Sequence, residues 1–171
     1  MTAPQGRSVA HAAGKEIKVG QAYQLAELAC PVSHVMRALY DQPLPPDGLN
    51  RYFVLSIGEG QRYVQCRMID GNRVMSCEAS SGFYSPAHLR QTGEQTAFIR
   101  SKQFAPPAKG GNFTRDFDIA DGPDFDTVSV ILVALLRNGF TSNVSEPVLV
   151  KAPSLGRSLR RIVRRQCVPL S

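Results

Sequence analysis

Residues 52–80 decide the fold, and they read YFVLSI (52–57), GEG (58–60), QRYVQCRMI (61–69), DGN (70–72) and RVMSCEAS (73–80). Three runs rich in β-branched, aromatic and other apolar residues are separated by short glycine-containing breaks, which is typical of strands joined by tight turns. Alternation with period two places Val64, Cys66 and Met68 on one face of the middle strand. The stretch therefore predicts a three-stranded antiparallel meander.

Apolar residues at helical spacing occur on both sides of the meander. A stripe from Val32 to Tyr40 predicts one helix, which we expect to begin at Pro31 because proline fits the first turn of a helix. A second stripe predicts a helix over residues 124–138, ended by a left-handed cap at Gly139.

Two further elements are predicted between these helices. Thr92 and Gln95 have the spacing of a capping box and open a helix that runs to about Gln103. Alternation over residues 113–119 predicts a fourth strand, and residues 148–150 predict a short edge strand.

The order helix, three strands, helix, strand, helix predicts an α+β fold. We expect an antiparallel sheet built on the meander, with the helices packed on one face so that their apolar stripes are covered. Residues 21–150 are predicted to form the single domain. Residues 1–20 are predicted to be a flexible leader, and residues 151–171 a basic amphipathic tail.

The excess positive charge of the chain lies in this tail. The net charge is +6, yet the last 21 residues hold six basic residues and no acid, so the rest is neutral. A positively charged surface for nucleic acid on residues 1–150 is thus excluded. The predicted anion-binding residues of the tail are Arg157, Arg160, Arg161, Arg164 and Arg165. These arginines could bind RNA, anionic lipid or an acidic protein. The alternative is a structural role, in which they form the solvated side of an amphipathic helix that packs on the domain or on a dimer partner.

The four cysteines favour buried free thiols in a reducing compartment. None forms a CxxC pair, so a zinc site is not predicted. Cys66 and Cys77 fall on inward-facing strand positions. If their two strands pair, a disulfide between them is the alternative to free thiols. No secretory signal and no run of about 20 apolar residues is found, so a cytoplasmic protein without a transmembrane segment is predicted.

Candidate catalytic groups are few, and the sequence predicts a protein that is not an enzyme. Cys30 and His34 form the sole Cys–His pair at helical spacing, with Pro31 between them. Aspartates near residues 116–126 lack the spacing of a calcium loop and are explained by a solvated strand edge and a helix cap. No cofactor and no metal is predicted.

Several short motifs resemble bacterial type III secretion chaperones and the related YbjN-like proteins, a group also termed Tir-chaperone-like. They match in order and spacing over residues 32–140, and they are Tyr63-Val64-Gln65, Glu78, Leu89, Gln95, Phe104, residues 111–115 and Gly139. The resemblance implies a small α+β fold and a binding activity without catalysis.

The same resemblance implies a homodimer that holds a client polypeptide on exposed apolar patches. The candidate partner-binding residues are Phe83, Tyr84, Phe104 and Phe113, with closure of the core as the alternative for each. We therefore predict a chaperone-like or adaptor protein. A protein that binds nucleic acid or an anionic surface through the arginine-rich tail is the alternative.

Overall fold

A computed structural model describes residues 17–19, 25–43, 51–107, 110–141 and 146–164. Its strands are β1 (Ile17–Val19), β2 (Tyr52–Ile57), β3 (Tyr63–Ile69), β4 (Val74–Ala79), β5 (Phe113–Asp118) and β6 (Val148–Lys151). Its α-helices are α1 (Leu25–Tyr40), α2 (Gly93–Ser101), α3 (Phe125–Ala134) and α4 (Ser158–Val163). The remaining helical segments are a π-helix η3 (Leu135–Phe140) and the 3-10 turns η1 (Asp70–Asn72), η2 (Ala87–Leu89) and η4 (Pro153–Leu155).

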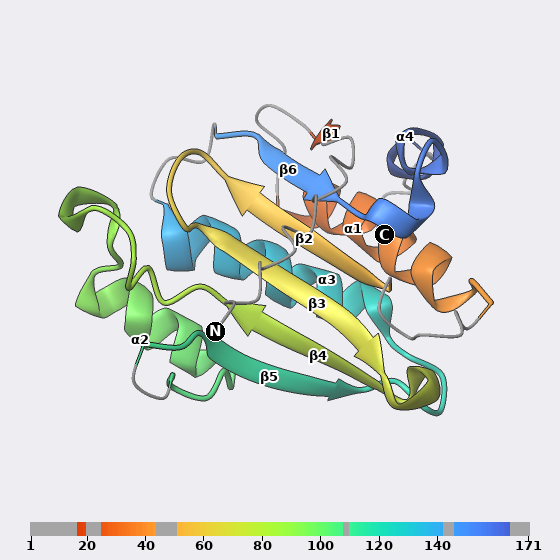
Figure 1. Cartoon of the computed structure of the whole chain (residues 1–171), viewed down its shortest axis with the longest axis horizontal. Helices are drawn as coiled ribbons and strands as arrows, with labels where there is room; N and C mark the ends of the chain where they lie inside the picture. The colour runs from red at the N-terminus through yellow and green to blue at the C-terminus, as the bar shows by residue number, and fades with distance from the viewer. Residues whose placement is uncertain (1–16, 20–24, 44–50, 108–109, 142–145, 165–171) are drawn as a thin grey trace, which may run out of the picture.

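The strands form one antiparallel sheet in the order β1-β6-β2-β3-β4-β5 (Figure 1). The predicted meander is confirmed as β2-β3-β4, and β5 adds to its far side. The turn at Asp70, Gly71 and Asn72 has φ of 52°, 61° and 69°, which is why glycine, aspartate and asparagine suit it.

The other side of the sheet differs from the prediction. Val148–Lys151 is an internal strand rather than an edge, because it pairs with β2 and also with β1. Residues 17–19, predicted to lie in a flexible leader, form β1; the rest of that predicted leader lies outside the described residues. Three residues are too short for a periodic signal, so strand pairing alone identifies β1.

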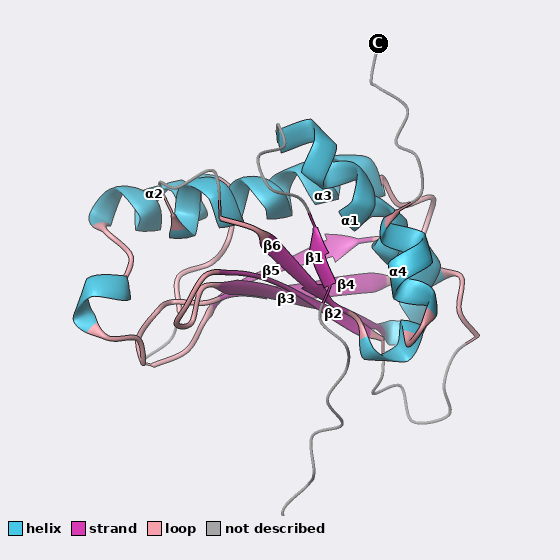
Figure 2. Ribbon diagram, turned by 90° about the horizontal axis from the view of Figure 1, so that it is seen from above, coloured by secondary structure: helices cyan, strands magenta, loops and turns pink. Residues whose placement is uncertain are grey.

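α1, α2 and α3 lie on one side of the sheet, as predicted for this α+β fold, and α4 stands at its end (Figure 2). α1 and α3 pack side by side on it, while α2 and α4 lie at opposite ends of the molecule (Figures 1 and 2). None of the helices α1, α2 and α3 covers the opposite face of the sheet (Figure 2). We call this face, which carries Tyr63, Gln65, Arg67, Glu78 and Asp116, the bare face.

Two helix boundaries differ from the prediction. α1 begins at Leu25 and contains Pro31, because Leu28 and Val32 are both buried and their burial outweighs the missing hydrogen bond of proline. α3 continues as η3 to Phe140 rather than ending in a left-handed glycine cap. Gly139 is needed there for another reason, since a Cβ would lie 2.9 Å from Cγ1 of Ile99.

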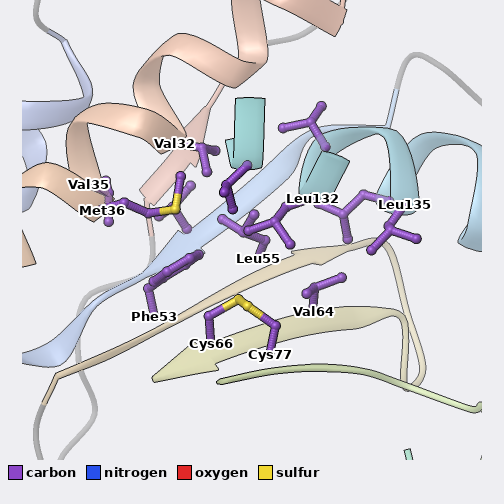
Figure 3. Packing of buried hydrophobic residues seen from close by; sticks show 14 of the residues in the cluster. Val32, Val35, Met36, Phe53, Leu55, Val64, Cys66, Cys77, Leu132 and Leu135 are labelled. Carbon is purple, nitrogen blue, oxygen red and sulfur yellow. A yellow bond between two sulfur atoms is a disulfide. The ribbon is translucent and has the colours of Figure 1, made fainter. Parts of the chain in front are cut away.

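The core lies between the sheet and the helices. Phe53, Leu55 and Val64 point from the sheet towards Met36 of α1 and Leu132 of α3 (Figure 3). The helices bury the stripes that the sequence predicted, and the strands bury every second residue. The apolar periodicity of the sequence therefore corresponds directly to the packed layer.

The cysteines correct the expectation of free thiols. Cys66 and Cys77 lie directly opposite each other on β3 and β4 and form a disulfide within the core (Figure 3). Cys30 is also disulfide-bonded. Sequence periodicity gave both strand positions the same inward direction, but only the register of the pairing brings the two sulfur atoms together.

Candidate functional site

Two aromatic side chains project from the loop between β4 and α2. Phe83 is 57% exposed and Tyr84 is 73% exposed. Their rings meet edge to face, with centroids 5.0 Å apart. Two adjacent large aromatics that remain exposed are unusual on a protein surface and are enriched where proteins bind one another. We call Phe83 and Tyr84 the aromatic pair.

The loop that carries the aromatic pair is fixed on both sides of it. Before the pair, the Ser80 carbonyl accepts a hydrogen bond of 2.8 Å from Nε2 of Gln91. After the pair, Oγ of Ser85 accepts one of 3.2 Å from the backbone N–H of Gln61. The Ser85 carbonyl also accepts one of 3.1 Å from Nε of Arg90. The aromatic pair is thus presented on a held loop, which reduces the entropy lost on binding.

A half-buried group of polar side chains lies on the bare face beside this loop. Oε2 of Glu78 accepts hydrogen bonds from Nε2 of Gln65 at 3.0 Å and from Nδ2 of Asn112 at 3.2 Å. The same Asn112 amide donates to the Tyr63 hydroxyl at 3.2 Å. We call Tyr63, Gln65, Glu78 and Asn112 the polar cluster.

Asn112 joins the polar cluster to the loop of the aromatic pair. Its Oδ1 accepts a hydrogen bond of 3.4 Å from the backbone N–H of Ser81. Tyr63, Gln65 and Glu78 come from neighbouring strands in register, and Asn112 immediately precedes β5. The sequence analysis named these residues only as motifs of the family resemblance and predicted no site from them, because cross-strand register is needed to bring their side chains together.

Phe104 and Phe113, the other two predicted partner-binding residues, belong to the core. They are 2% and 4% exposed. Phe113 begins β5 on its buried face, and the Phe104 ring stacks edge to face on Phe117 with centroids 6.5 Å apart. A partner cannot reach them, so the prediction of a binding surface at these two residues is wrong and the alternative of core closure is correct.

The Cys30–His34 pair has no free thiol. Sγ of Cys30 lies 3.9 Å from Nε2 of His34, but Cys30 is disulfide-bonded. A half-cystine cannot act as a thiolate nucleophile. Within the part of the chain that the structure describes, no group of three or more His, Cys, Asp and Glu side chains could hold a metal ion.

The aspartates near residues 116–126 separate into two groups. Asp116 and Asp118 are exposed on β5, as expected of a solvated strand. Asp124 caps α3, where its carboxylate accepts from Thr127 Oγ1 at 2.6 Å and from Thr127 N–H at 3.0 Å. Asp126 pairs with Arg37 at 2.8 Å. The hydrogen bonds from Thr127 lower the pKa of the Asp124 carboxyl.

Asp124→Ala is expected to lower the free energy of unfolding at neutral pH by about 1 kcal/mol, the usual effect of losing an N-cap. Because the folded-state pKa of Asp124 is lowered, its contribution is present above the unfolded pKa of about 4 and is lost as pH falls through the folded value. Urea denaturation at a series of pH values measures this. Asp124→Asn keeps the acceptor and is the control. A wild-type-to-alanine difference that stays constant down to the lowest pH would contradict the assignment.

The arginine-rich segment is a docked part of the domain. Leu155, Leu159, Ile162 and Val163 are buried, and α4 packs on α1 and β1. Four of the predicted anion-binding residues are exposed on the outer side, and they are Arg157, Arg160, Arg161 and Arg164. Arg165 lies outside the described residues. The predicted boundary between domain and tail is therefore wrong up to residue 164, because the apolar stripe completes the core.

No family model, no curated protein and no solved structure matches this chain. Among the described residues, no helix is both long and apolar enough to cross a membrane.

Proposed function

We propose that this chain is a non-enzymatic, chaperone-like or adaptor protein that binds an extended polypeptide, as the resemblance to secretion chaperones and YbjN-like proteins implies. The observation that carries the proposal is the aromatic pair, held on a fixed loop beside the polar cluster. The combination suits a peptide, because aromatic rings cover apolar side chains while amide and carboxylate groups hydrogen-bond to its backbone.

The polar cluster is built from residues of the motifs that resemble this family. Tyr63, Gln65, Glu78 and Asn112 all belong to the motifs on which the resemblance was based, and their side chains form one connected set of hydrogen bonds.

Binding to an array of short immobilised peptides tests this function. In the double variant Phe83→Ser with Tyr84→Ser, we expect binding to the peptides that the native chain selects to fall at least about tenfold, since central aromatics contribute about 2 kcal/mol or more to interfaces. Val130→Ser is the matched control, because Val130 is an exposed apolar residue on α3. Equal binding by native and double-variant protein would refute the aromatic pair as the site.

We further propose that the chain works in an oxidising compartment. The sequence predicted a cytoplasmic protein and, with it, reduced thiols. The described cysteines are instead bonded, and structural disulfides are rare where glutathione and thioredoxin keep thiols reduced. Fractionation of the native cell with thiol labelling before reduction tests this location.

The resemblance also implies a homodimer, and we keep that assembly as part of the proposal. Sedimentation analysis over a range of protein concentrations tests it independently of peptide binding. A single species with the mass of one chain at every concentration would remove the dimer and leave the peptide site to be judged by the array.

A further inference from the structure

Four arginines lie on one face of α4 and its two cap residues. Arg157, Arg160, Arg161 and Arg164 follow one another at helical spacing and are all exposed. At 3.6 residues per turn they lie within a sector about 100° wide. Leu159, on the opposite side, is buried. We call these four residues the arginine face.

The arginine face has no acidic partner in the described part of the chain. The ion pairs found there join Arg37 to Asp126 and Arg62 to Glu146, both on other elements. Four like charges on one short helical segment repel one another unless an anion binds between them. Guanidinium groups bind phosphate and carboxylate groups through paired hydrogen bonds.

An acidic strand edge and the aromatic pair both lie away from the arginine face. Asp116 and Asp118 are exposed on β5, the edge of the sheet farthest from β1, on which α4 packs. The loop that carries the aromatic pair, between β4 and α2, lies at the opposite end of the molecule from α4 (Figures 1 and 2). An anionic plane would therefore attract the α4 end and leave both the acidic edge and the aromatic pair directed away from it.

We propose that the arginine face binds the anionic headgroups of a lipid bilayer and holds the domain on the membrane surface with the aromatic pair directed away. Binding occurs without insertion, because the apolar residues that an amphipathic helix would place in the lipid are here buried in the core. Among polyanions, lipid is favoured over nucleic acid because the disulfides indicate an oxidising compartment.

Co-sedimentation with vesicles tests this proposal. We expect the native chain to bind vesicles that contain both phosphatidylglycerol and phosphatidylcholine, and not to bind vesicles of phosphatidylcholine alone. Binding should be lost when the salt concentration is raised well above the physiological value, because salt screens the charges. Each arginine near an anionic surface contributes roughly a fivefold gain in affinity, so Arg160→Glu with Arg161→Glu is expected to weaken binding at least about 25-fold. Because both side chains are exposed, the fold is retained.

The matched control is Arg67→Glu with Arg100→Glu. Both are exposed and lie away from α4, on β3 and at the end of α2, and the change in net charge is the same. This control is expected to bind vesicles within about threefold of the native chain. Equal loss in the two double variants would show that net charge alone matters and would overturn the proposal.

Two further results would also overturn the proposal. One is binding to a single-stranded RNA or double-stranded DNA oligomer with no binding to anionic vesicles, which assigns the arginine face to nucleic acid. The other is no binding to either. Because the vesicle assay contains no peptide and the peptide array contains no lipid, failure of this proposal is distinguishable from failure of the polypeptide-binding function.

Discussion

Replacing Leu159 and Ile162 together by alanine is expected to lower the free energy of unfolding by about 4–8 kcal/mol, since each buried aliphatic residue cut to alanine loses roughly 2–5 kcal/mol. Both side chains are buried where α4 packs on α1 and β1. A domain of this size has roughly 5–15 kcal/mol of stability, so the double variant is expected to be partly or fully unfolded at 25 °C.

Guanidinium denaturation measures this loss, and circular dichroism shows whether the double variant is folded at the outset. Arg160→Ala with Arg161→Ala is the matched control, because it shortens two neighbouring side chains that are exposed on the same helix. We expect that control to change stability by less than about 0.5 kcal/mol. If both double variants had native stability, α4 would not be part of the core.

Removing the cross-strand disulfide is expected to have the second largest effect on stability. Cys66→Ala with Cys77→Ala should lower the free energy of unfolding by about 3 kcal/mol, by the loop-entropy relation for a bond that joins residues 11 apart in the chain. Alanine is the suitable replacement because both positions are buried and a hydroxyl there would lack a partner.

Two measurements check the disulfide prediction. Alkylation of the unfolded, unreduced protein followed by mass spectrometry should show no label at Cys66 or Cys77. Thermal unfolding without reductant should then show a lower midpoint for the double variant. Ser76→Ala, on the opposite face of β4 and only half-buried, is the control and should leave the midpoint nearly unchanged. Alkylation of both cysteines before reduction would contradict the bond.

The two proposed binding surfaces lie at opposite ends of the same domain. The aromatic pair projects from the loop between β4 and α2, and the arginine face lies on α4 (Figure 1). A protein held on a membrane by one end could present a bound polypeptide at the other. Each surface has its own assay and its own control variant. A negative result for one proposed binding activity therefore leaves the other proposal to be tested separately.

The sequence determined by itself the elements whose signals are local. The meander followed from alternation and glycine-containing turns, and the start of α2 from its Thr92 capping box, which the structure contains in full. The burial of the stripes in α1 and α3 followed from their periodicity. The exposure of Phe83 and Tyr84 was predicted together with that of Phe104 and Phe113, and sequence alone did not separate the two pairs.

Tertiary structure decided the features that depend on which distant segments meet. Strand pairing placed β6 inside the sheet between β1 and β2, and strand register joined Cys66 to Cys77. Register also brought Glu78 and Asn112 together in the polar cluster, and packing on α1 turned the predicted tail into part of the domain. Composition and periodicity describe the faces of single elements. The pairing of these faces depends on contacts between segments that are distant in the sequence. Packing must overcome the entropy lost on closing the intervening loops, and no single stretch of the chain encodes that balance.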